Sequence, residues 1–329
     1  MKHPPPASRH AGHAFTLVEV LTASAIALLL LSALAGAVIR MGEDGRCLGD
    51  HIDRGARVRL VLDQMSTDLQ SILVRQDTNN WLALDILEEP GNSGLWLDAP
   101  GQKPASDSLV LDPRTEPDEK GREWALPEDY RFGVGGMWLR FFTTAADRGI
   151  LDDGKPVPGD VNAVSYQLIR RAMPGVGGGT SAGGSYQLFR SLVKADETFR
   201  SGYKIEAYAG AASTGGPGEL KSPSEDSLIC DNILDIGVIV HEMNAEQQFV
   251  QAFPMRHKSL PPLKNPRQYR VPQDGIPASI EIMIRVISLS GSRELRSAEA
   301  AGIDPEAWWR LAKRHSRMYS RHFSIPRAF

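Results

Sequence analysis

Two short patterns in the sequence contain residue types that nucleophilic catalysis and metal binding use. Gly179–Gly183 matches G-x-S-x-G, in which the serine, here Ser181, attacks from a strained turn between a strand and a helix. This copy lies in a glycine-rich tract between two similar strand patterns, so we expect a hairpin loop instead. His241 and Glu242 begin the zinc pattern H-E-x-x-H, but Ala245 replaces the second histidine, which the metal needs one helical turn further on. We therefore expect neither a catalytic residue nor a metal site from these patterns.

Aspartates and cysteines leave two weaker options open. Four aspartates of one predicted loop could supply oxygen ligands to calcium, but they lack the EF-hand spacing, and a solvated turn is the simpler interpretation. They are Asp147, Asp152, Asp153 and Asp160. Cys47 and Cys230 are too few for a disulfide framework or a four-thiolate zinc site, although one disulfide between them stays open for an oxidising compartment. No cofactor is expected.

Composition excludes several classes of protein. The 329 residues include 37 basic and 40 acidic side chains, a net charge of −3, so no general electrostatic attraction to nucleic acid is expected. Hydrophobic residues at 42% and charged residues at 23% are ordinary values for a globular chain and exclude a disordered or fibrous one. The length suits one large domain or two ordinary ones.

Glu19 is the one charged residue of an otherwise apolar segment, Phe15 to Ile39. As a helix this segment would be roughly 37 Å long, enough to cross a hydrocarbon core of about 30 Å. A carboxylate within such a span costs about 2.5–3.5 kcal/mol, so it needs a specific reason. Residues 1–14 carry Lys2 and Arg9 and no acid, which favours a cytoplasmic leader and export of the rest.

Two ordinary explanations of the apolar segment leave Glu19 unexplained. A secretory signal has support, because Ala33–Ala35 and Ala35–Ala37 both fit a small-x-small cleavage site. The run is nevertheless longer than the about 7–15 apolar residues of such a signal. A plain membrane anchor is the second explanation, and it too gives no reason for the acid.

The stretch from Ala14 to Leu21, AFTLVEVL, resembles the class III signal of type IV prepilins and type II secretion pseudopilins. The resemblance implies that a prepilin peptidase cleaves between Ala14 and Phe15 and methylates the new amine of Phe15. It also implies that Glu19 then sits beside the N-terminus of a neighbouring subunit and serves assembly. The chain departs from the family at Ala14, where glycine is usual.

An amphipathic helix is predicted after the apolar segment, because apolar residues recur at three- and four-residue spacing from Val58 to Leu73, with Asp63 and Asp68 largely outside that stripe.

The predicted fold class is α+β and pilin-like, a long N-terminal helix packed on an antiparallel sheet with long loops. The predicted parts are a leader peptide (1–14), a transmembrane helix (15–39), an amphipathic helix continuing into the exported domain (40–78), an antiparallel β-rich domain (79–307) and a basic tail (308–329).

Short runs rich in aromatic and β-branched residues predict the strands of that domain. They are Leu109–Leu111, Met137–Thr143, Val161–Arg170, Tyr186–Val193, Ile233–His241 and Ile280–Ser288. Two of them contain a repeated pattern, SYQLIR at 165–170 and SYQLFR at 185–190. With no third copy, we expect these two strands to be neighbours in one antiparallel hairpin.

The order of helix, hairpin and later strands resembles the J class of minor pseudopilins of type II secretion, including a strand pair whose second strand contains Leu188-Phe189-Arg190. A fainter resemblance is to the prepilin-like members of Verru_Chthon cassettes. The resemblance implies a non-enzymatic filament subunit, anchored by a single pass in the inner membrane with its globular domain in the periplasm. The implied partners are the prepilin peptidase, other minor pseudopilins, the major pseudopilin and inner-membrane lipid, and no nucleic acid is expected.

Two alternatives remain at this level. A minor pilin for adhesion or DNA uptake would need an exposed basic stripe, for which residues 308–327, with six basic side chains and no acid, are the one candidate. A membrane-anchored exported enzyme using the same route would need a convergent set of His, Ser and acidic residues in one cleft. The basic tail is also the candidate surface for an acidic partner or anionic lipid.

Overall fold

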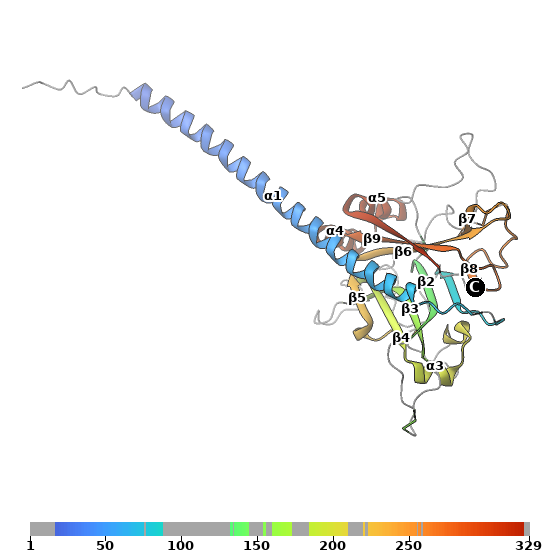
Figure 1. Cartoon of the computed structure of the whole chain (residues 1–329). Coiled ribbons are helices and arrows are strands. Elements are labelled where there is room, and N and C mark those ends of the chain that lie inside the picture. The colour runs from blue at the N-terminus through green and yellow to red at the C-terminus, as the bar shows by residue number, and fades with distance from the viewer. Residues whose placement is uncertain are drawn as a thin grey trace, which may run out of the picture. The chain divides into compact units, whose positions relative to one another are not determined.

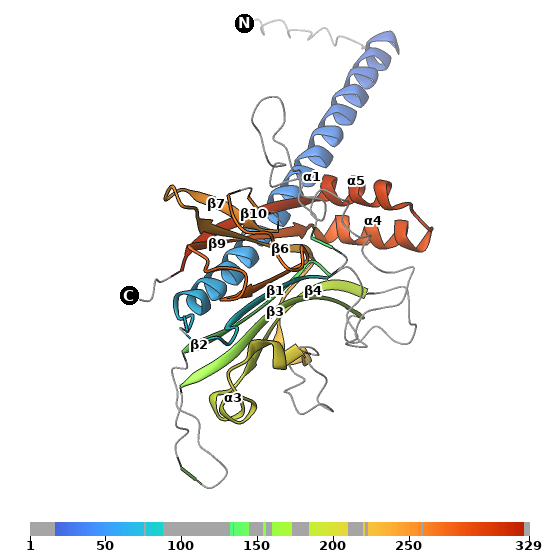
Figure 2. The same cartoon turned by 90° about the vertical axis from the view of Figure 1, so that its right-hand side faces the viewer.

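A long helix, two antiparallel sheets and a helical pair near the C-terminus make up the described part of the chain (Figures 1 and 2). The computed structural model describes residues 17–75, 77–87, 132–133, 135–144, 154–155, 160–172, 184–209, 220, 223–254, 256–257 and 259–325. Of these, the side chains of residues 19, 23, 37–53, 171, 172 and 209 are outside the description. The chain divides into two units, residues 1–52 and 53–329.

The helix α1 extends from Leu17 to Gln70. Among the residues that the structure describes, no helix is both long enough and apolar enough to cross a membrane. In the second unit, the apolar stripe predicted from the sequence is buried, with Val58, Val61 and Met65 at most 1% exposed. A helix with one such apolar face is stable only when that face packs on another element.

The larger sheet has six antiparallel strands in the order β5-β4-β3-β2-β1-β8. In chain order they are β1 (Leu82–Ile86), β2 (Met137–Thr144), β3 (Val161–Ala172), β4 (Gly184–Val193), β5 (Leu228–Asp231) and β8 (Gln268–Val271). Short helical segments flank β4 and β5, namely α3 (Ala195–Ser201), η2 (Ile205–Ala209) and η5 (Glu225–Ser227).

The smaller sheet has four antiparallel strands in the order β10-β9-β6-β7. They are β6 (Ile233–Met243), β7 (Phe249–Phe253), β9 (Ser279–Ile287) and β10 (Ser316–Ser324), and the helices α4 (Leu289–Ala300) and α5 (Pro305–His315) connect β9 to β10. Each helix begins with a side-chain cap, Ser288 for α4 and Asp304 for α5, which accepts a hydrogen bond from a backbone N–H of the first turn.

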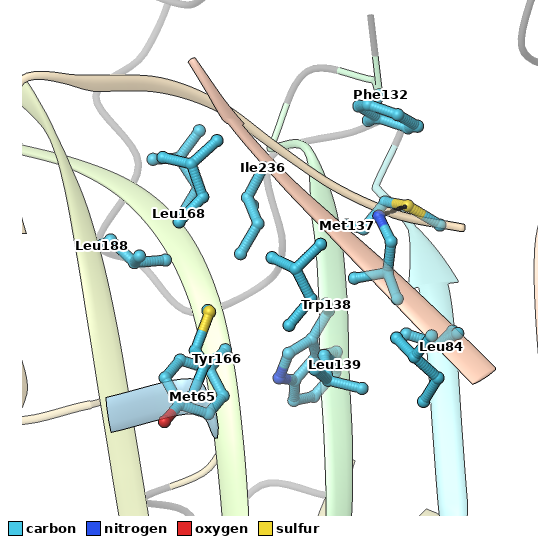
Figure 3. Close-up of a cluster of buried hydrophobic side chains, with 14 of the residues drawn as sticks. Met65, Leu84, Phe132, Met137, Trp138, Leu139, Tyr166, Leu168, Leu188 and Ile236 are labelled. Carbon is cyan, nitrogen blue, oxygen red and sulfur yellow. Dashed lines mark hydrogen bonds between the residues drawn. The ribbon is translucent and has the colours of Figure 1, made fainter. Parts of the chain in front are cut away.

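The hydrophobic core lies between the two sheets, where β6 contacts β2, β3 and β4. Figure 3 labels members from each layer, and their side chains converge on one region. They are Met65 of α1, Leu84 of β1, Phe132, which precedes β2 in the chain, Met137, Trp138 and Leu139 of β2, Tyr166 and Leu168 of β3, Leu188 of β4 and Ile236 of β6. Burial of the facing sides of the two sheets and of the apolar stripe of α1 makes the main contribution to the stability of the domain.

The α+β class and the antiparallel sheets are confirmed, and so is the predicted hairpin. Strand β3 pairs with β4 in a register that places Tyr166 opposite Arg190 and Leu168 opposite Leu188. The runs that predicted β2, β6 and β9 are strands as well, whereas residues 109–111 lie outside the described residues. The hairpin is predictable because its two strands are close in sequence and share one alternation of inward and outward side chains.

Two predicted boundaries differ from the structure. Helix α1 ends at Gln70 and not at residue 78, because Leu73 donates its backbone N–H to Phe142 of β2 and Ile72 bridges to Thr143. The predicted basic tail, 308–329, is not a tail where the structure describes it, since residues 308–324 belong to α5 and to β10, which pairs with β9 along its whole length. Trp308 and Trp309 are buried, so their apolar surface holds this segment against the domain.

Gly237 of β6 provides a test of how the smaller sheet packs against Phe132, the residue that precedes β2. A Cβ at this position would lie 1.8 Å from a ring carbon of Phe132, which is itself fully buried. We expect Gly237→Ala to lower the free energy of unfolding by about 1–3 kcal/mol through overpacking. Denaturant unfolding of the full-length chain, followed by tryptophan fluorescence, measures the change.

The matched control is Gly55→Ala on α1, where a Cβ meets nothing within 4 Å. There the same substitution is expected to stabilise by about 0.5–1 kcal/mol, because alanine favours a helix interior. Equal effects of the two substitutions would contradict the packing of Phe132 over Gly237.

Candidate functional site

The best-defined polar arrangement in the second unit fixes the end of α1 to the larger sheet. Asp68 of α1 is 5% exposed and accepts two hydrogen bonds from Arg190 of β4, from Nε at 2.7 Å and from Nη2 at 2.9 Å. The hydroxyl of Tyr166 on β3 donates a third bond to the same carboxylate. Such a fork of two parallel bonds fixes orientation as well as charge. We call Asp68, Tyr166 and Arg190 the helix-docking cluster.

Burial and the charge of Asp68 shape the proton affinities in the helix-docking cluster. Burial, followed by the nearby negative charge of Asp68, raises the pKa of the Tyr166 hydroxyl. Burial alone would lower the pKa of Arg190, but its hydrogen bonds and attraction to Asp68 outweigh that effect and raise it. Tyr166 is therefore a neutral donor and Arg190 a cation, and both hold the carboxylate of Asp68 on α1.

Weaker polar contacts continue along the same helix. Arg57 pairs with Asp231 of β5 at 2.5 Å, and Asp63 pairs with Arg321 of β10 at 2.6 Å. Arg54 also donates to the backbone oxygen of His315 at the end of α5, at 3.3 Å. Helix α1 is therefore held by both sheets and by the C-terminal helical pair.

A second buried cluster joins the C-terminal helices to the β3–β4 hairpin. Glu299 of α4 accepts hydrogen bonds from Arg170 at 2.6 Å, from Tyr186 at 3.2 Å and from the indole of Trp308 at 2.7 Å. The carboxylate is 6% exposed and Arg170 only 1%. A buried carboxylate with three donors is satisfied and acts as a structural anchor.

A third cluster lies where β1, β2 and β8 meet. Asp85 bridges Arg140 and Arg270, the second at 2.6 Å, and Arg140 stacks over the ring of Trp138 at 3.8 Å. Burial lowers the pKa of Arg140 to about 10, although Asp85 opposes the shift. The guanidinium thus stays charged at neutral pH.

A fourth cluster contains Glu242, which together with His241 begins the incomplete H-E-x-x-H pattern of the sequence. Its carboxylate accepts a hydrogen bond from the Tyr269 hydroxyl at 2.6 Å and lies 3.5 Å from Arg256. Burial raises its pKa, while Tyr269 and Arg256 act in the opposite direction. Both His241 and Glu242 belong to strand β6, which agrees with the expectation that this segment is not a zinc-binding helix.

Several candidates from the sequence lie outside the described residues. They are the cleavage pair Ala14 and Phe15, the serine of the G-x-S-x-G pattern, Asp147, Asp152, Asp153 and the side chains of Glu19 and Cys47. The backbone of Glu19 belongs to α1, and Asp160 is exposed just before β3. Cys230 is buried in β5, where its thiol contacts the backbone oxygen of Asp231 at 3.4 Å. The calcium site and the disulfide therefore stay open options.

The N-terminal part of α1 has apolar side chains that are exposed on every side. Ten of them between Leu17 and Leu34 are 58–79% exposed, including the consecutive residues Leu28–Leu31, which at about 100° per residue surround the helix axis. Ser24 and Ser32 donate their hydroxyls to backbone oxygens of the preceding turn, at 2.9 and 2.8 Å. These hydroxyls are thus satisfied without water.

Comparisons with known proteins assign no relative. No protein-family model matches the chain, and no curated protein or solved structure matches it. Among the described residues, no group of three or more His, Cys, Asp or Glu side chains is placed to hold a metal ion.

Asp68 is the residue of the helix-docking cluster whose burial the sequence pattern did not predict. It was expected outside the apolar stripe, yet the structure buries it. One signal was available, because Asp68 adjoins Leu69 and lies three residues after Met65, at the margin of the stripe. Arg190 was noted in the Leu188-Phe189-Arg190 pattern, but its partner depends on the tertiary fold.

We expect Asp68→Ala to lower the free energy of unfolding by about 3–5 kcal/mol, since Arg190 and the Tyr166 hydroxyl then lose a buried partner. Asp63→Ala is the matched control on the same helix, because Asp63 is 60% exposed in its pair with Arg321 and its loss should cost only about 0–1 kcal/mol. Chemical denaturation of both full-length variants measures the two costs, and similar values would contradict a docking role for Asp68.

Proposed function

We propose that this chain is a non-enzymatic, minor pseudopilin-like subunit of a type II secretion or type IV pilus-like filament. It is anchored in the inner membrane by a single helix at residues 15–39, with its globular domain in the periplasm. The observation that carries the proposal is the sequence from Ala14 to Leu21, in which Glu19 is the fifth residue after the cleavage position. Part of this stretch lies outside the described residues, so the proposal takes the anchor from the sequence.

The surface of α1 supports an apolar environment for its N-terminal part. A helix with exposed leucines on every side is stable when lipid or other helices surround it. The internal hydrogen bonds of Ser24 and Ser32 suit such surroundings, because unsatisfied hydroxyls are costly there. Small residues such as Ala27, Ala33 and Gly36 would let neighbouring helices approach closely.

The buried carboxylates support a structural and not a catalytic role for the domain. Each of the four described above has a cationic or hydroxyl partner that holds it in one orientation. Catalytic carboxylates and bases instead face a cleft and the reacting group. The partners of the proposed subunit are the prepilin peptidase, other minor pseudopilins, the major pseudopilin and membrane lipid.

The N-terminus of the mature chain tests the proposal directly. Mass spectrometry of the protein from its native membrane should find a chain that begins with N-methylated Phe15. A chain that begins near Leu34 or at Val38 would indicate an ordinary secretory signal, and an intact leader would indicate a plain anchor. Either result would overturn the proposal.

Glu19 provides a separate test of assembly. A carboxylate in lipid is costly unless it is paired, and the amine created at Phe15 of a neighbouring subunit is a suitable partner. We expect Glu19→Ala to keep membrane insertion and cleavage but to lose cross-linking to other pseudopilins. Ser24→Ala, which removes a neutral polar group from the same segment, is the control and should assemble normally. Normal cross-linking of the Glu19 variant would contradict the pairing.

A further inference from the structure

Two histidines that are distant in sequence meet on the smaller sheet. His241 lies on β6 and His322 on β10, and β9 separates these two strands. Neighbouring strands are about 4.8 Å apart, so the backbones of β6 and β10 are about 10 Å apart. The ring centroids are nevertheless only 5.6 Å apart, with an angle of 40° between the rings. Both rings therefore lean toward each other over β9.

Unpaired polar atoms surround His241 on the same row of the sheet. Its cross-strand partners are Gln251 of β7 and Ser279 of β9, whose side chains share its face of the sheet. The buried atoms His241 Nδ1, Gln251 Nε2 and Ser279 Oγ have no hydrogen-bond partner among the described residues. Each such atom costs about 1–3 kcal/mol when left unpaired. Three on one row indicate that a polar group or ion belongs there.

The separation of the rings suits an ion held between them. Zinc–imidazole bonds are about 2.0–2.1 Å long, so two imidazoles on one tetrahedral ion have ring centroids about 5 Å apart. The observed 5.6 Å is close to this value, and a small rotation of the exposed His322 ring would make up the difference.

Charge and protonation also favour a cation at this place. Burial lowers the pKa of His241, the neighbouring His322 lowers it further, and Glu281 acts in the opposite direction. His241 is therefore neutral at neutral pH, the form that binds metal. Glu281 of β9 is directly opposite His322, and its carboxylate adds negative charge beside the pair.

We propose that His241 and His322 bind a divalent transition-metal ion of the zinc or copper type, with water completing its coordination. Because no third protein ligand in the described part of the chain is placed to join them, the site is expected to be weak and open. It is independent of the proposed filament function and departs from the expectation that the chain has no metal site. A bound ion would link β6 to β10, whose Arg321 holds α1 through Asp63.

Titration of the full-length chain with Zn²⁺ by calorimetry tests the site. All proteins should carry His3→Ala, His10→Ala and His13→Ala, because these leader histidines could bind the ion by themselves. We expect one ion per chain, and a loss of affinity of about tenfold or more in His241→Ala and in His322→Ala. His257→Ala is the control, since this exposed ring contacts Ser259 instead, and its affinity should be unchanged.

A second measurement separates metal binding from an effect on folding. Zn²⁺ should raise the melting temperature of the parent chain and leave that of His322→Ala, an exposed position, unchanged. Lowering the pH should weaken binding, because protons then compete with the ion for the ring nitrogens. Equal Zn²⁺ affinity in the parent and in the His241→Ala/His322→Ala double variant would overturn the site, as would no binding at millimolar Zn²⁺.

Discussion

One buried carboxylate decides how the helix and the larger sheet fit together. Asp68 is removed from water, and a charge in that position is tolerated only with partners of fixed geometry. Arg190 and Tyr166 supply those partners from two neighbouring strands. A shift of α1 by one residue would move the carboxylate away from the guanidinium, and it would also turn the buried apolar stripe by about 100° away from the core. The ion pair and the hydrophobic burial therefore specify the same register of the helix.

The same arrangement recurs at the margins of the core. Glu299 joins the C-terminal helices to the hairpin through Arg170, and Asp85 joins β1 to β2 and β8 through Arg140 and Arg270. In each case a buried carboxylate of one element is paired with a guanidinium of another element. The domain is thus specified by ion pairs between elements as well as by its core, which would suit the proposed filament subunit.

Local sequence patterns predicted the β3–β4 hairpin and the apolar stripe of α1, but they did not predict the short strands. Strands β5, β7 and β8 have only four or five residues, too few to show a clear alternation. Strand β10 was not predicted either, because its arginines indicated a basic tail. Its place in the sheet follows from pairing with β9 and from the burial of Phe323 and, in the preceding helix, of Trp308.

By itself the sequence determined the apolar run with its single acid, the amphipathic stripe of α1 and the β3–β4 hairpin. Each of these depends on residues close together in the chain, where periodicity and spacing act directly. Only the tertiary structure decided that Asp68 is buried against Arg190, that the basic segment becomes a strand and that His241 meets His322. These outcomes depend on pairings across long stretches of chain, because desolvation and electrostatic energies are set by the neighbours that folding brings together.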